Sequence, residues 1–140
     1  MEMGIVLIPL TVLTFGITEL GRAMYQYNAI AKATRDAARF LSAQGPGMGY
    51  AEAKNLVVCG QTGSCGDSAL VPGLTTAMVG ICDSVASVAC ASTHAAQPTG
   101  SGAINLVTVT VTGYPFTSVV PFVVPSMTFN PISTTMRQIL

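Results

Sequence analysis

The chain has 140 residues, of which 50% are hydrophobic and only 9% are charged, and its formal net charge is zero. A nucleic-acid partner is not expected, because binding to phosphates requires clustered lysine and arginine side chains. This composition favours a membrane or a packed protein assembly as the surroundings of the chain.

The first predicted element is a helix that begins with sixteen uncharged residues, Met3–Thr18, between Glu2 and Glu19. At about 1.5 Å per residue this run spans roughly 24 Å, which is short of the ~30 Å hydrocarbon core of a bilayer. We expect it to cross a membrane only with local thinning or with help from its flanks. Pro9 removes one backbone hydrogen bond and therefore predicts a kink or a local unwinding.

No basic segment precedes this apolar run, and no small-residue cleavage site follows it. A cleavable secretory signal peptide normally has both features. We therefore expect either an uncleaved anchor or a short leader removed just before Met1.

The helical pattern continues after Glu19 as far as Leu41. Residues at spacings of four and three predict one buried face, namely Leu20, Met24, Tyr27, Ala31, Thr34, Ala38 and Leu41. Gly45-Pro46-Gly47 predicts the end of the helix, since proline lacks the N–H group and glycine leaves helical geometry easily. We expect a helix over about residues 2–44, near 60 Å long, and a small head domain over residues 45–140.

Charged side chains on this helix are spaced so that they can pair. Glu19 and Arg22 are three residues apart, and Lys32 and Asp36 are four apart, which places each pair on one face. Arg35 and Arg39 could bridge to a neighbouring chain in an assembly. The alternative is a solvated helix face.

The head is predicted to combine a short helix with an antiparallel sheet, which gives an α+β fold. The clearest strand is Ile104–Thr112, where valine and threonine alternate, and we expect its valines to pack on the long or the short helix. The other expected elements are a helix over 50–58, a loop over 60–73, strands over 75–82 and 85–91, a loop over 94–103 and a final strand or split hairpin over 126–138.

The segment Thr117–Pro125 is apolar, but it contains Pro121 and Pro125. Proline cannot donate a hydrogen bond to a neighbouring strand, so a central strand is excluded there. We expect an extended surface segment or a turn of helix.

Four cysteines in the head predict two disulfides formed in an oxidising compartment. The sequential pairing of Cys59 with Cys65 and of Cys82 with Cys90 is favoured because both loops are short, but the other two connectivities remain open. A zinc site that combines these thiols with His94 is the alternative, although no C-x-x-C pair is present. Positive-inside reasoning applied to the basic residues between Arg22 and Arg39 alone would instead place the head in the cytoplasm.

Neither enzyme chemistry nor a cofactor is predicted. His94 is the single histidine, and it lies in a segment rich in proline, glycine and serine with no carboxylate beside it. The chain has no phosphate-binding glycine loop and no haem-attachment motif. We therefore expect a structural or binding protein.

Three segments carry a resemblance to a known family. They are Glu2–Leu10 with its internal proline, Phe15–Asn28 followed by Ala33–Arg39, and Val107–Pro115 with Met136 and Arg137 near the end. Together they resemble the TadE-like pilins of the tight-adherence system, a branch of the type IV pilin superfamily. In that family the glutamate usually lies a few residues after the processed N-terminus, whereas here it is second, and the four cysteines are an addition.

The resemblance implies a structural subunit of an extracellular filament that serves adhesion or surface attachment. The subunit would polymerise with copies of itself through its N-terminal helix, and it would reside in the inner membrane before assembly. A prepilin peptidase and the pilus assembly machinery are the implied partners. One alternative is a minor pseudopilin that primes or caps a filament from the inner membrane, and another is a membrane-anchored binding domain with one span.

Six residues are expected to contribute to assembly. They are Glu2, Pro9, Glu19, Arg22, Arg35 and Arg39. The resemblance suggests that Glu2 meets the α-amino group of a neighbouring subunit and so sets the register, which would offset the cost of burying either charge alone. A surface position at the start of the helix, where a carboxylate favours the helix dipole, is the alternative.

Overall fold

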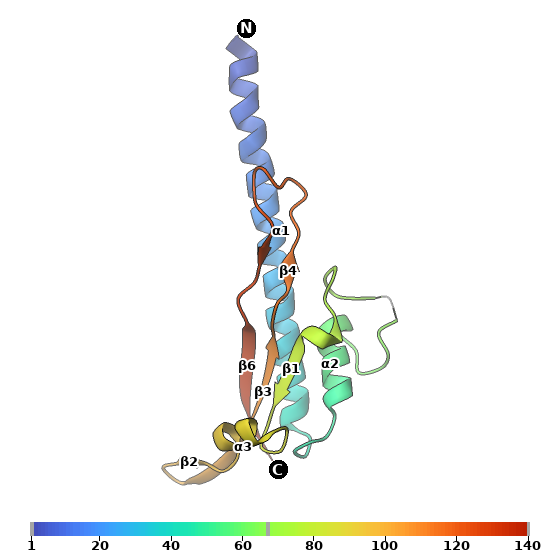
Figure 1. Cartoon of the computed structure of the whole chain (residues 1–140), viewed down its shortest axis with the longest axis vertical. Coiled ribbons are helices and arrows are strands. Elements are labelled where there is room, and N and C mark those ends of the chain that lie inside the picture. Colours follow the sequence, from blue (N-terminus) through green and yellow to red (C-terminus); the bar gives the residue numbers. More distant parts are fainter. Residues whose placement is uncertain (1, 67, 140) are drawn as a thin grey trace.

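One helix, α1 (Glu2–Ser42), runs along the whole length of the molecule and projects far beyond the rest of it (Figure 1). A computed structural model of the chain describes residues 2–66 and 68–139. The predicted helix and its end before Gly45 are confirmed. The helix is continuous through Pro9, so the expected local unwinding is not found there; the hydrogen bonds of the adjacent turns hold the helix across the single missing bond.

The head contains short helices and a small antiparallel sheet, as the predicted α+β fold requires. Its elements are α2 (Tyr50–Cys59), the 3₁₀ helix η1 (Thr76–Met78), β1 (Val79–Cys82), α3 (Val88–His94), β2 (Gln97–Thr99), β3 (Gly102–Val111), β4 (Pro115–Phe116), β5 (Met127–Thr128) and β6 (Ile132–Gln138). The final segment is split as expected, with β5 pairing to β4 and β6 to the main sheet.

Strand β3 is the centre of the main sheet and pairs antiparallel with β1, β2 and β6. In this register Val109 lies opposite Ile81 on one side and Thr134 on the other. Strands β4 and β5 form a separate two-stranded ribbon, and the loop between them extends along α1 toward its N-terminus (Figure 1).

The core lies between the C-terminal half of α1, helix α2 and one face of the sheet. Val107, Val109 and Val111 of β3 are buried there, which confirms the expected packing of the alternating valines. The helices contribute mainly small or branched residues, namely Ile30, Ala33, Ala37, Ala38 and Leu41 from α1 and Ala53, Val57 and Val58 from α2. Alanines on α1 allow the sheet and α2 to approach the helix axis closely.

The buried face of α1 differs from the predicted one in its first half. The buried residues are Glu19, Ala23, Gln26, Ile30, Ala33, Thr34, Ala37, Ala38 and Leu41. Leu20, Met24 and Tyr27 are exposed instead, so the expected core role of Tyr27 is wrong. Ala23 faces the head because a small residue lets the chain approach, and Gln26 and Glu19 find hydrogen-bond partners there.

The strand predicted over 85–91 is wrong, because this segment leads into helix α3. The Ser87 hydroxyl caps the helix by accepting a hydrogen bond from the Cys90 N–H group (3.1 Å). Val85 and Val88 are exposed, and exposed valines gain little from a strand. The predicted loop over 94–103 is also wrong in part, since it contains β2 and the beginning of β3.

Candidate assembly and anchoring surface

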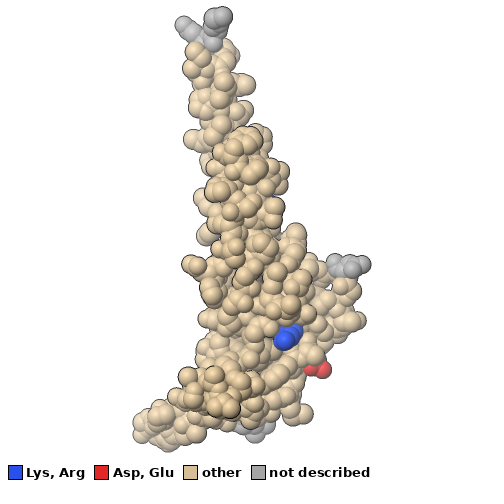
Figure 2. All heavy atoms as spheres, viewed as in Figure 1, with Lys and Arg blue, Asp and Glu red and all other residues tan. Residues whose placement is uncertain are grey.

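The N-terminal half of α1 presents an apolar surface that the rest of the chain does not cover. Its large apolar side chains from Met3 to Ile17 are between 46% and 87% exposed. The helix is long and apolar enough to cross a membrane, judged by length and composition. On the face shown in Figure 2, this projecting part carries no lysine, arginine, aspartate or glutamate between the undescribed tip and the head.

Where this surface meets the head, Glu19 and Arg22 form an ion pair on α1. Their closest atoms, Arg22 Nη2 and Glu19 Oε2, are 2.9 Å apart. We use the name strap for residues 115–128, which comprise β4, β5 and the loop between them. The strap covers Glu19, which is only 6% exposed.

The carboxylate of Glu19 fastens the strap to the helix. It accepts hydrogen bonds from the Ser118 hydroxyl (3.0 Å) and from the Val119 N–H group (3.1 Å), in addition to those from Arg22. Arg22 donates to the carbonyl oxygen of Thr117, and its guanidinium carbon lies 4.6 Å from the centre of the Phe116 ring. The two charges are therefore satisfied by the chain's own loop, with a cation–π contact added.

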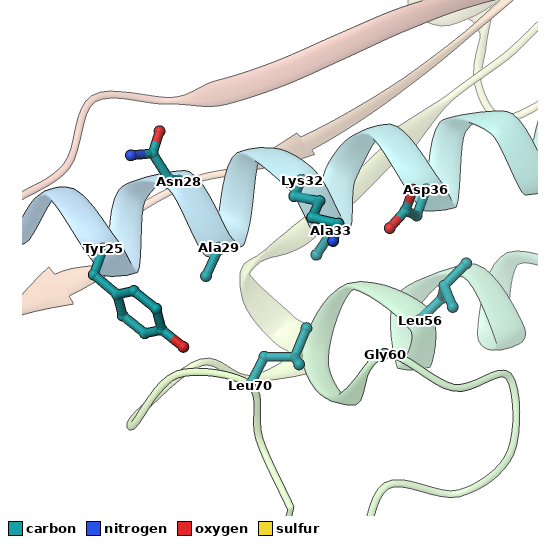
Figure 3. A pocket seen from close by; sticks show the side chains of 9 residues that line it. All are labelled: Tyr25, Asn28, Ala29, Lys32, Ala33, Asp36, Leu56, Gly60 and Leu70. Atoms are coloured by element: carbon teal, nitrogen blue, oxygen red, sulfur yellow. The ribbon is translucent and has the colours of Figure 1, made fainter.

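The other charged residues of α1 are placed differently. Lys32 and Asp36, whose spacing allows a pair, are not within ion-pair distance; within the described residues Glu19 and Arg22 form the single pair. Lys32 and Asp36 line a groove of about 480 Å³ between α1 and α2, together with Tyr25, Leu56 and Leu70 (Figure 3). This groove is mainly apolar, with one charge of each sign on its wall.

The remaining predicted assembly residues lie apart from one another. Pro9 is exposed on the free half of α1, and Arg39 is exposed in the last helical turn. Arg35 is exposed beside a second groove, which is lined by Tyr27 of α1 and Ile132 of β6. Glu2 begins α1, but its side chain lies outside the described part of the structure.

Sequence reasoning missed Asp83, which connects the turn between β1 and α3 to the connection between α1 and α2. Its buried carboxylate accepts hydrogen bonds from the N–H groups of Gly47 (2.9 Å), Val85 (2.9 Å) and Ala86 (2.8 Å). The available signal was an aspartate in the turn after a strand, where its side chain caps local N–H groups. No local sequence pattern indicates Gly47 as a partner of Asp83, because the two residues are 36 positions apart.

Burial alone would raise the pKa of Asp83, but hydrogen bonding outweighs it. The Tyr50 hydroxyl beside the carboxylate and the three N–H groups together hold the pKa of Asp83 below its usual value. Burial and the neighbouring Asp83 carboxylate raise the pKa of Tyr50 well above its ordinary value. The Tyr50 oxygen is buried and makes no hydrogen bond of normal geometry.

Both predicted disulfides are confirmed, one between Cys59 and Cys65 and one between Cys82 and Cys90. The zinc alternative is wrong, because all four thiols are used in these bonds. His94 Nε2 lies 2.7 Å from the Thr108 hydroxyl, so this side chain connects α3 to β3. Across residues 2–66 and 68–139, no three histidine, cysteine, aspartate or glutamate side chains gather in a way that could hold a metal ion.

Comparison with known families adds the decisive observation. Residues 1–39 match the family model described as TadE-like protein. The N-terminal helix of this chain is therefore similar to that of TadE-like proteins. The TadE-like family is pilus-related, and this likeness suggests a protein associated with a tight-adherence pilus. Comparison with curated proteins and with solved structures finds no match.

The TadE-like segment coincides with α1. It covers the free apolar half, the Glu19–Arg22 pair and the part of the helix that packs in the core. The likeness to the TadE-like family therefore covers the helix that carries the exposed surface. It does not extend to the rest of the head.

Proposed function

We propose that this TadE-like chain is a structural subunit of an extracellular, type IV pilus-like filament that serves adhesion or surface attachment. Its polymerisation would proceed through α1. The observation that supports this most strongly is the exposed apolar surface from Met3 to Ile17. Full burial of each large apolar side chain is worth about 1.5–3 kcal/mol, so this surface is not suited to water.

Two kinds of surroundings can accept such a helix. A bilayer can hold it before assembly, and the helices of neighbouring subunits can surround it afterwards. Moving from lipid to protein brings no hydrophobic gain, so assembly would depend on close packing between helices. Gly4 and Gly21 fit this requirement, because beyond the adjacent helical backbone no atom of the chain lies within 4 Å of where a Cβ would stand at either position.

The proposed location follows from the same features. The subunit would reside in the inner membrane before assembly and in an extracellular filament afterwards. Two disulfides suit an oxidising compartment for the head. By the family resemblance, a prepilin peptidase and the pilus assembly machinery are the proposed partners.

The test is electron microscopy of filaments sheared from producing cells, together with intact-mass analysis of their subunit. We expect filaments built from this chain, with a mass four hydrogens below that of the reduced form. Detection only in the membrane fraction would favour the minor pseudopilin. A stable monomer in detergent, with no sheared filaments, would favour the anchored binding domain.

A pair of variants separates assembly from membrane insertion. Gly4→Leu keeps α1 apolar, and a Cβ at this position would have no neighbour within 4 Å beyond the adjacent helical backbone, so membrane amounts should match those of the wild type. Filaments should be strongly reduced, because the added side chain holds neighbouring helices apart. Val88→Leu, on an exposed site of α3, is the control and should keep filaments. Normal filaments from Gly4→Leu would argue against close packing at this end of α1.

A further inference from the structure

We propose that the tip of the strap, residues 119–125, inserts into the headgroup region of the lipid bilayer when α1 spans it. The head would then rest on the membrane through Phe122. This inference depends on the membrane-anchored stage of the proposed function, but not on filament formation.

The composition and exposure of the tip suit a membrane surface. Its sequence is Val119-Val-Pro-Phe-Val-Val-Pro125, which contains no charged side chain and no side chain able to form a hydrogen bond. Phe122 is 89% exposed and Val119 is 75% exposed. An exposed apolar patch of this kind usually marks an interaction site, and aromatic side chains favour the membrane interface.

Most backbone N–H groups of the tip already have hydrogen-bond acceptors within the chain, which suits an environment poor in water. The Val119 N–H donates to Glu19, and the Val120 N–H donates to the Ser118 hydroxyl (3.2 Å). The N–H groups of Val123 and Val124 both donate to the carbonyl of Val120, at 3.0 and 3.1 Å. The two prolines have no N–H group. Six of the seven residues therefore present no free backbone donor, which lowers the cost of leaving water.

The position of the tip along α1 matches the expected membrane boundary. The strap lies beside α1 and points toward its N-terminus (Figure 1). A Cβ at Gly16 would lie 3.6 Å from the Val123 side chain, so the tip reaches the helix at the level where the uncharged run ends. With that run in the hydrocarbon core, the tip lies at the headgroups.

The strap also shields the charges that follow the uncharged run at the membrane boundary. Glu19 and Arg22 follow the uncharged run, and unpaired charges at this depth would be costly. Their pairing, together with the cover of the strap, reduces this cost.

A test by fluorescence is direct, because the chain contains no tryptophan. The full-length variant Phe122→Trp is reconstituted in phosphatidylcholine vesicles with and without brominated acyl chains. We expect blue-shifted emission and loss of most of the fluorescence with the brominated lipid. Val88→Trp, on the exposed surface of α3, is the negative control, and Phe15→Trp on α1 is the positive control.

Two results would overturn the inference, and they differ in what else they affect. If Phe15→Trp is quenched but Phe122→Trp behaves like Val88→Trp, the anchor stands and the strap does not touch the membrane. If neither is quenched, the membrane-anchored stage itself fails. An emission shift of Phe122→Trp that follows protein density and not bromination would identify a second copy of the chain as the partner and would also contradict the proposal.

Discussion

The single side chain of Asp83 connects the turn between β1 and α3 to Gly47, which lies 36 residues away in the sequence. It accepts a hydrogen bond from Gly47, in the connection between α1 and α2, and two more from the turn before α3. Gly47 has a φ angle of +80°, and a Cβ there would lie 3.1 Å from the Val85 side chain. The close approach that this carboxylate makes possible therefore depends on glycine at its partner position.

Asp83→Asn tests this connection. The amide retains one acceptor but cannot replace the charge, so we expect a loss of about 1–3 kcal/mol in the free energy of unfolding at neutral pH. Because the folded-state pKa of Asp83 is lowered, its stabilisation is complete above the unfolded value of about 3.9 and is lost as the pH falls through the folded pKa. Urea unfolding at about pH 7 and pH 2.5 should therefore show the difference between variant and wild type shrinking in acid. A constant difference would contradict this role.

Glu19→Ala tests the attachment of the strap. The substitution removes the acceptor for Ser118, Val119 and Arg22, so the strap should open more often and its amide groups should exchange several-fold faster. Hydrogen–deuterium exchange of Val119 and Val120 is the measurement. Arg35→Ala, an exposed change on the same helix, should leave their exchange unaltered. Unchanged exchange in Glu19→Ala would mean that Phe116 and its neighbours hold the strap without the ion pair.

At the scale of elements, the head combines an antiparallel sheet with two segments, each of which is held in place by its own disulfide. The bond between Cys59 and Cys65 closes the start of the long loop after α2, and the bond between Cys82 and Cys90 joins the end of β1 to α3. Helix α3 has seven residues and buries none of them fully. Its position therefore depends on the disulfide, on the Ser87 cap and on His94 more than on a core of its own.

Removal of each disulfide should destabilise the head to a similar degree but with different local effects. The closed loops have sequence separations of 6 and 8, for which chain entropy predicts roughly 2–3 kcal/mol each. Replacing Cys82 and Cys90 by alanine should also expose α3 to proteolysis. Replacing Cys59 and Cys65 should instead expose the loop after α2. Thermal unfolding with mapping of the cleavage sites measures both effects, and identical cleavage patterns would contradict the local assignment.

At the scale of the whole molecule, one helix serves two environments. Its C-terminal half supplies a wall of the head's core, and its N-terminal half stands free (Figure 1). The transition lies between Gly16 and Glu19, where the strap first reaches the helix. The head should therefore fold without the free half of α1.

A chain that lacks residues 1–15 tests this division. It retains Glu19, Arg22 and every core residue of α1, so we expect a folded protein with both disulfides. Its membrane association should be lost, because the greater part of the uncharged run is gone. Circular dichroism, intact mass and flotation with vesicles are the measurements. An unfolded product would show that the free half of the helix supports the head.

Several features of this protein follow from the sequence by itself. The uncharged run and the proline-glycine end define α1, the valine-threonine alternation defines β3, and the short spacings favour the observed disulfide pairs. The likeness to the TadE-like family is also carried by a continuous segment. These features depend on residues close together in the chain, where periodicity and loop closure determine the outcome.

The tertiary structure decided which face of α1 is buried, how Glu19 and Arg22 are used and where Asp83 finds Gly47. The hydrogen bond between Glu19 and Val119 joins residues 100 positions apart, and that between Asp83 and Gly47 joins residues 36 apart. A helical repeat predicts that a face exists, but not which neighbour will cover it. Leu20 and Met24 stayed exposed because the strap supplied polar partners for Glu19, and only the folded chain brings those partners together.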